Sequence, residues 1–157
     1  MLSLIAEASA TFVGFSLAIG LLQPDQPNAA SRHNSMRGVA ELAMIAGAGA
    51  LLALLLDAFG LPSATVWRLA SAALAMGWAV ATFFASRRIR RVGSRMTRSS
   101  TLLVVPILVS SGVLLLAWNT IAPDASSGAR YNAALVFALS AAASLFLLSA
   151  FEHAPRA

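Results

Sequence analysis

Three acidic residues, Glu7, Glu41 and Asp57, lie within long apolar stretches of this sequence. A charged side chain at the centre of a bilayer costs at least about 2.5 kcal/mol, so it needs a partner, water or a proton. Antiparallel helices would bring Glu7, Asp57 and Arg68 to the same end of the molecule. The sequence therefore predicts either a buried ion pair between Asp57 and Arg68 or an aqueous path for cations lined by Glu7 and Asp57.

Glu41 is expected to have a structural role. It follows Gly38 by three residues, near the start of its apolar stretch. An acid is favoured at the N-terminus of a helix, where the backbone dipole is positive. Arg37 or an arginine of the segment 86–98 is the expected partner.

Small residues recur at intervals of four in the first two apolar stretches, and this spacing lets helices approach closely in a membrane. The stretch 2–22 carries Ala6, Ala10, Gly14 and Ala18, and the stretch 38–59 carries Ala43 and Gly47. These residues predict tight helix packing, either within one chain or between copies.

The composition indicates which elements position these residues. The 157 residues are 59% apolar and 11% charged, whereas soluble domains are about 45 to 50% apolar and about 25% charged. A stretch of some 21 residues spans ~31 Å as a helix, enough for a ~30 Å hydrocarbon core. We predict an all-α polytopic membrane protein with a single transmembrane domain over residues 1–157. Its five transmembrane helices are expected at 2–22, 38–59, 65–85, 101–121 and 131–151, and the first is expected to be retained rather than cleaved as a signal peptide.

The connector 86–98 predicts the orientation. Its six arginines are Arg87, Arg88, Arg90, Arg91, Arg95 and Arg98, and it contains no acid. Short basic loops stay in the cytoplasm, so the N-terminus is expected outside and the C-terminus inside. The connector is also expected to contact anionic lipid. Proteins from GC-rich bacterial genomes tend to contain little lysine, and this chain contains none. We therefore expect the protein in the cytoplasmic (inner) membrane of a bacterium.

The sequence lacks the residues that several kinds of chemistry require. Without cysteine or lysine there is no thiolate, no Schiff base and no cysteine-held cofactor. His33 and His153 lie outside the apolar stretches. We therefore expect no catalytic residues, no metal, no cofactor and no nucleic-acid partner. Trp67, Trp118 and Tyr131 are expected to form an aromatic belt at the outer interface.

The residues Ile5-Ala6-Glu7 and Gly14-Phe15 resemble the first helix of uncharacterised small bacterial multi-span membrane proteins. This resemblance covers one helix and implies no activity. The intramembrane acids favour a homo-oligomeric channel or transporter for cations or protons. The alternative is a non-catalytic accessory or scaffold subunit of a larger membrane complex.

Overall fold

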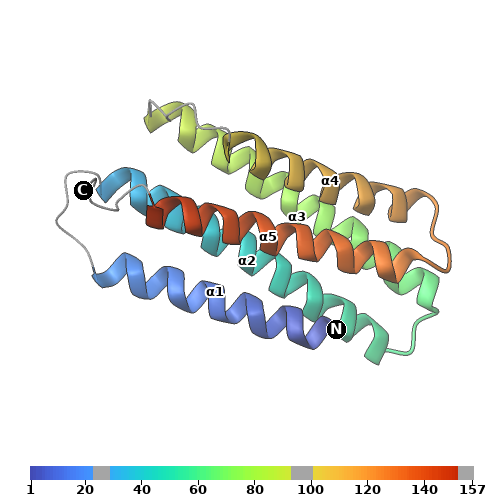
Figure 1. Cartoon of the computed structure of the whole chain (residues 1–157). Helices are drawn as coiled ribbons and strands as arrows, with labels where there is room; N and C mark the ends of the chain where they lie inside the picture. The colour runs from blue at the N-terminus through green and yellow to red at the C-terminus, as the bar shows by residue number, and fades with distance from the viewer. Residues whose placement is uncertain (23–28, 93–100, 152–157) are drawn as a thin grey trace.

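The computed structural model describes residues 1–22, 29–92 and 101–151, which form five α-helices (Figure 1). The helices are α1 (Leu2–Leu22), α2 (Ala29–Ala58), α3 (Ser63–Val92), α4 (Thr101–Ile121) and α5 (Ser127–Phe151). Each of the five apolar stretches lies almost entirely within one of these helices. The all-α fold class is confirmed.

Three helices extend beyond the apolar stretches, because polar residues can continue a helix past its apolar part. α2 begins at Ala29 rather than 38, and α5 begins at Ser127 rather than 131. α3 continues to Val92, since arginine is a good helix former. Part of the expected connector is therefore helical. That part carries Arg87, Arg88, Arg90 and Arg91, whereas Arg95 and Arg98 lie outside the described residues.

A tight turn joins α2 to α3. Gly60 has a φ of +70°, a left-handed conformation that glycine adopts without steric cost. Its N–H donates to the carbonyl of Asp57 at 2.9 Å, and the carbonyl of Pro62 accepts from Thr65 and Val66 at 2.8 and 3.0 Å. The two helices are consequently antiparallel neighbours.

Helices α2 to α5 form an antiparallel four-helix bundle to which α1 is added at the side. Around the bundle, α2 packs on α3, α3 on α4, α4 on α5, and α5 on α2. α1 packs on α2 and to a small extent on α5, and within the described residues it makes no contact with α3 or α4. α1 and α4 lie on opposite sides of the molecule (Figure 1). We call the end with Met1, the α2–α3 turn and the α4–α5 loop the N-terminal end, and the opposite end the basic end.

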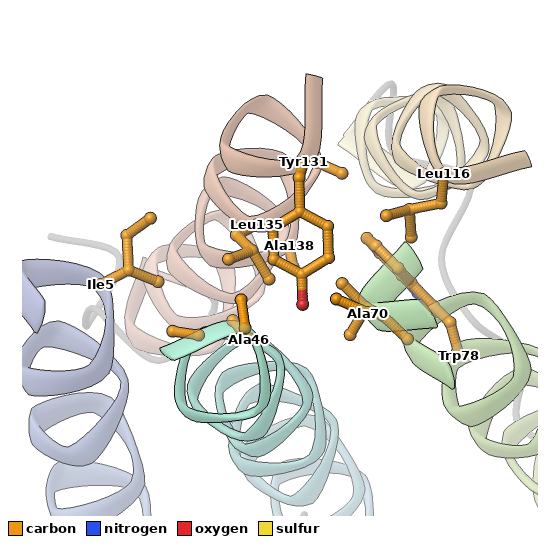
Figure 2. Packing of buried hydrophobic residues seen from close by; sticks show 12 residues of the cluster. Ile5, Ala46, Ala70, Trp78, Leu116, Tyr131, Leu135 and Ala138 are labelled. Atoms are coloured by element: carbon orange, nitrogen blue, oxygen red, sulfur yellow. The ribbon is translucent and has the colours of Figure 1, made fainter. Parts of the chain in front are cut away.

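The interior of the bundle is built mostly from alanine, with a few large side chains between the helices. Figure 2 shows Ala46 of α2, Ala70 and Trp78 of α3, Leu116 of α4 and Tyr131 of α5 gathered at its centre. Small residues allow the helix backbones to approach closely. Trp78 contacts α4 at Gly112, where an added Cβ would lie 2.8 Å from the indole ring.

Large apolar side chains cover much of the outer surface, as a lipid environment requires. Examples are Leu51, Met76, Leu114 and Ile121, all well exposed. Within the described residues, three stretches are long and apolar enough to cross a membrane: Met36–Ala58, Ser63–Phe84 and Ser127–Leu147. Two shorter apolar helical stretches, Leu2–Ala18 and Val105–Ile121, accompany them.

Candidate functional site

Asn119, which the sequence analysis did not single out, is the buried hub of a polar network at the N-terminal end. Its side-chain amide donates to the carbonyl of Ser127 at 2.7 Å and to the hydroxyl of Ser71 at 3.4 Å. Its side-chain oxygen accepts from the guanidinium of Arg130 at 3.2 Å. Asn119 thereby links α4 to both α3 and α5.

The α4–α5 loop completes this network through Asp124. Its carboxylate pairs with Arg130 and accepts from the backbone N–H and the hydroxyl of Ser126 at 2.8 and 2.7 Å. The backbone N–H of Asp124 donates to the hydroxyl of Ser127 at 2.9 Å. An acid just before the N-terminus of α5 also interacts favourably with the helix dipole. We refer to Ser71, Asn119, Asp124, Ser126, Ser127 and Arg130 as the Asn119 network.

These hydrogen bonds lower the pKa of Asp124. The hydroxyl of Ser126, the guanidinium of Arg130 and the backbone N–H of Ser126 all stabilise the ionised form, and the pKa falls from 3.8 to about 2. Asp124 is solvent-exposed and lies outside the helices. A carboxylate with a lowered pKa stabilises the fold above its unfolded pKa and loses this contribution as the pH falls through the folded value.

We therefore expect the wild-type bundle to lose stability as the pH is lowered from 3.8 to about 2. The variant Asp124→Asn should lose less over this window, because it lacks the titrating group. Thermal unfolding in detergent across this pH range provides the measurement. Asp57→Asn, which removes an acid at the same end of the molecule, serves as the control. Identical pH profiles for wild type and Asp124→Asn would contradict the assignment.

Tyr131 does not belong to an aromatic belt. It is fully buried, and its hydroxyl donates to the backbone carbonyl of Gly49 in α2 at 2.7 Å. Its ring extends from α5 toward α2 and α3 (Figure 2) and packs against Trp67 with 5.6 Å between the ring centroids. Of the three aromatic residues, Trp118 alone is largely exposed, at 60%.

Glu7, Asp57 and Arg68 all lie on helices at the N-terminal end, and all three side chains are exposed. Asp57 and Arg68 do not pair with each other, because both point to the outside of the bundle. Among the described residues, the side chains of these three make no ion pair and no hydrogen bond; the backbone carbonyl of Glu7 accepts from the hydroxyl of Thr11 at 3.0 Å. The expected ion pair within one chain is therefore not formed.

Glu41 lies in α2 toward the basic end and has the partner that the sequence indicated. The guanidinium of Arg37 donates to its carboxylate at 2.9 Å, one helical turn away. On α3, Arg87 also lies toward the basic end. Its guanidinium lies over the ring of Phe83, with 4.6 Å between the guanidinium carbon and the ring centroid. These contacts hold two of the arginines near the basic end.

Some of the small residues of α1 and α2 are buried within the chain, and others are exposed on its surface. Ala43 is fully buried, and a Cβ on Gly47 would lie 3.0 Å from Ser9 of α1. On α1, the residues that face the bundle are Ile5, Ser9 and Ser16, all buried. Ala6 is partly buried, whereas Ala10, Gly14 and Ala18 are exposed together with Glu7 and Thr11. We call Glu7, Ala10, Thr11, Gly14 and Ala18 the outer face of α1.

The part of the chain that the structure describes brings no three histidine, aspartate or glutamate side chains together as metal ligands. In comparisons with protein-family models, curated proteins and solved structures, none matches the chain.

Proposed function

We propose that this chain forms a homo-oligomer in the inner membrane of a bacterium and moves cations or protons across it. In this proposal all five helices cross the membrane, with the N-terminus outside and the arginine-rich end of α3 in the cytoplasm. The apolar outer surface and the three long apolar stretches support a membrane location. The concentration of arginine at the basic end supports this orientation, because basic segments stay inside.

The observation that carries the proposal is the exposed carboxylate of Glu7 on the outer face of α1. The outward surface of α4 presents large apolar residues such as Ile107 and Leu114. The outer face of α1 presents a carboxylate, a hydroxyl and small residues between the exposed apolar side chains of Leu4, Phe15 and Leu17, and a Cβ added to Gly14 would meet nothing within 4 Å. Such a face suits a neighbouring helix or water better than lipid chains.

Two features favour cations as the transported species. Asp57 lies near the end of α2, at the same end of the molecule as Glu7, and its carboxylate is also exposed. When several copies assemble, each of these acids is repeated around the assembly, with Asp57 nearer the N-terminal end than Glu7. A set of carboxylates concentrates cations at an entrance through its electrostatic field, and intramembrane acids also act as proton relays.

Flux through liposomes tests this function. We expect Glu7→Gln and Asp57→Asn each to lower the rate of cation or proton uptake, because each removes a negative charge from the path. Leu114→Gln adds an amide to the surface of α4, away from both acids, and should leave the rate unchanged. Equal flux in the wild type and both acid variants would exclude these carboxylates from the mechanism.

The same outer face also supports a second candidate, a non-catalytic subunit of a larger membrane complex. Small residues on a peripheral helix accept a helix of another protein as readily as a second copy. Gentle detergent extraction followed by native mass spectrometry separates the two candidates. Foreign chains at fixed stoichiometry would support the accessory subunit, and identical chains alone would support the homo-oligomer.

A further inference from the structure

We propose that Glu7 is a proton-binding site at the middle of the membrane, where its carboxyl carries a proton while it meets apolar surroundings. The inference rests on the proposed function and narrows the transported species to protons. It starts from the depth of Glu7 in the bundle. The contacts between α1 and α2 fix this depth, whereas the position of Glu7 in the sequence does not indicate it.

The helix α1 begins deeper in the bundle than the α2–α3 turn. A Cβ on Gly47 of α2 would lie 3.0 Å from the Cβ of Ser9 of α1, so these two residues lie at one level. Because the two helices are antiparallel, Glu7, two residues before Ser9, is level with Gly49. Figure 1 shows the same offset, since the first turn of α1 falls short of the α2–α3 turn.

Gly49 marks the middle of the apolar length of three helices. A Cβ on Gly49 would lie 2.9 Å from side-chain carbons of both Leu74 of α3 and Leu135 of α5. The long apolar stretches of these helices are Met36–Ala58, Ser63–Phe84 and Ser127–Leu147. Gly49, Leu74 and Leu135 lie nine, eleven and eight residues from the limits of these stretches at the N-terminal end. At about 1.5 Å per residue these intervals are about 12 to 17 Å, close to half of a ~30 Å hydrocarbon core.

The side chain of Glu7 is exposed at this depth among apolar neighbours. Leu4, one helical turn before it, and Phe15, two turns after it, are exposed as well. Lysine and arginine reach the membrane surface from within the apolar core through their long stems, but glutamate has only two methylene groups. An ionised acid in such a place is costly, and a buried group of this kind becomes neutral instead. A protonated Glu7 also lets the outer face of α1 meet apolar surroundings.

The helix α2 offers no charge close to Glu7. Every charged or titratable residue of α2 is at least eight residues from Gly49 in the sequence. Glu41 and Asp57, on either side of Gly49, are therefore each about 12 Å away along the helix axis. Glu41 is in addition paired with Arg37.

The helix α5, which α1 also contacts, offers none either. Its charged and titratable residues are Arg130 and Tyr131. Arg130 pairs with Asp124. The hydroxyl of Tyr131 lies at the level of Gly49, but it is fully buried inside the bundle and donates to the carbonyl of Gly49. Within the described part of the chain, a proton is therefore what neutralises Glu7.

The surroundings of Glu7 suit a proton better than a metal cation. Calcium and magnesium ions take six or more oxygen ligands, and the carboxylates of α2 are about 12 Å away along the axis. The hydroxyl of Thr11, on the same face of α1, already donates to the backbone carbonyl of Glu7 at 3.0 Å. A single carboxyl, by contrast, binds one proton without any further ligand.

The lipid-soluble reagent dicyclohexylcarbodiimide tests the site, because it reacts with protonated carboxyls in apolar surroundings. The acid O–H adds across one C=N bond, no group leaves, and the chain gains the mass of one reagent molecule. In the full chain in liposomes, we expect this label on Glu7 and a block of proton uptake. Glu7→Gln should lose the label, and Glu7→Asp, which keeps the carboxyl, should retain it. The exposed Asp124 should instead react with a water-soluble carbodiimide and an added amine.

Spin labels measure the depth without relying on the reactivity of the carboxyl. The native sequence contains no cysteine, so Glu7→Cys and the control Asp57→Cys each carry one label. The label at position 7 should be more accessible to oxygen, which dissolves in lipid, than to a water-soluble nickel chelate. The label at position 57 should show the reverse preference.

The possible failures are distinct. Modification of Glu7 by the water-soluble reagent, or a label at position 7 that prefers the nickel chelate, would place Glu7 in an open aqueous path and overturn this inference. Absence of the lipid-soluble label from Glu7 would overturn it too. Cation flux would in both cases remain consistent with the proposed function. A chain that is labelled on Glu7 but takes up no protons would overturn the proposed function and leave the proton-binding site.

Discussion

Replacing Gly112 with valine is expected to destabilise the bundle by about 1 to 3 kcal/mol, the usual cost of forcing extra atoms into a packed interior. A Cβ at this position would lie 2.8 and 3.1 Å from two ring atoms of Trp78 and 3.5 Å from the carbonyl oxygen of Ala134. Trp78 is only 1% exposed, so its rigid ring has little space to move away. The new side chain must therefore separate α4 from α3.

Gly77 supplies the matched control for this prediction. It is also a helical glycine, but it is exposed, and a Cβ there would meet nothing within 4 Å. Gly112→Val and Gly77→Val change the intrinsic helix propensity equally, so the difference between them isolates the contact with Trp78. Thermal unfolding in detergent, followed by tryptophan fluorescence, measures it. Equal stability of the two variants would show that α3 and α4 are not packed through Gly112.

The helices were largely predictable because the local sequence determines them. The apolar stretches are bounded by helix-ending residues, and Gly60 with Pro62 marks the α2–α3 turn in both sequence and structure. The limits of α3 were less predictable. The apolar stretch indicates which part of a helix lies in lipid, but it does not mark where the helix ends. A helix continues as long as its residues favour helical structure, and arginine favours it.

The packing partners could not be predicted, because they depend on contacts between residues far apart in the sequence. Tyr131 has the amphipathic side chain typical of a membrane interface, yet its hydroxyl bonds Gly49, 82 positions earlier. Asn119 is one of two adjacent polar residues near the end of an apolar stretch, and its partner Ser71 is 48 positions away. A contact between residues so far apart produces no periodic pattern in the sequence.

The faces of α1 illustrate the same limit at the candidate site. The four-residue spacing of Ala6, Ala10, Gly14 and Ala18 indicates a surface for close packing. Only the structure distinguishes the side with Ile5, Ser9 and Ser16, which packs within the chain, from the side that stays exposed.

The Asn119 network should make Asn119→Leu one of the most damaging single substitutions in the chain, with an expected loss of about 2 to 3 kcal/mol. Hydrogen bonds between membrane helices contribute about 0.6 kcal/mol each on average, so the three lost bonds alone account for about 2 kcal/mol. The remainder arises because Ser71 keeps a buried hydroxyl and Arg130 loses an acceptor for its charge.

Asn132→Leu should stabilise the bundle or leave its stability unchanged. It is a stringent control because it removes the same side-chain amide group as Asn119→Leu. The side-chain oxygen of Asn132 is buried, yet it accepts no hydrogen bond from any described residue. Removing a buried acceptor without a partner relieves a desolvation cost instead of breaking a contact. Unfolding of both variants in detergent gives the comparison. If Asn132→Leu proved as destabilising as Asn119→Leu, the loss would reflect the change of side-chain shape and not the hydrogen bonds that join α3, α4 and α5.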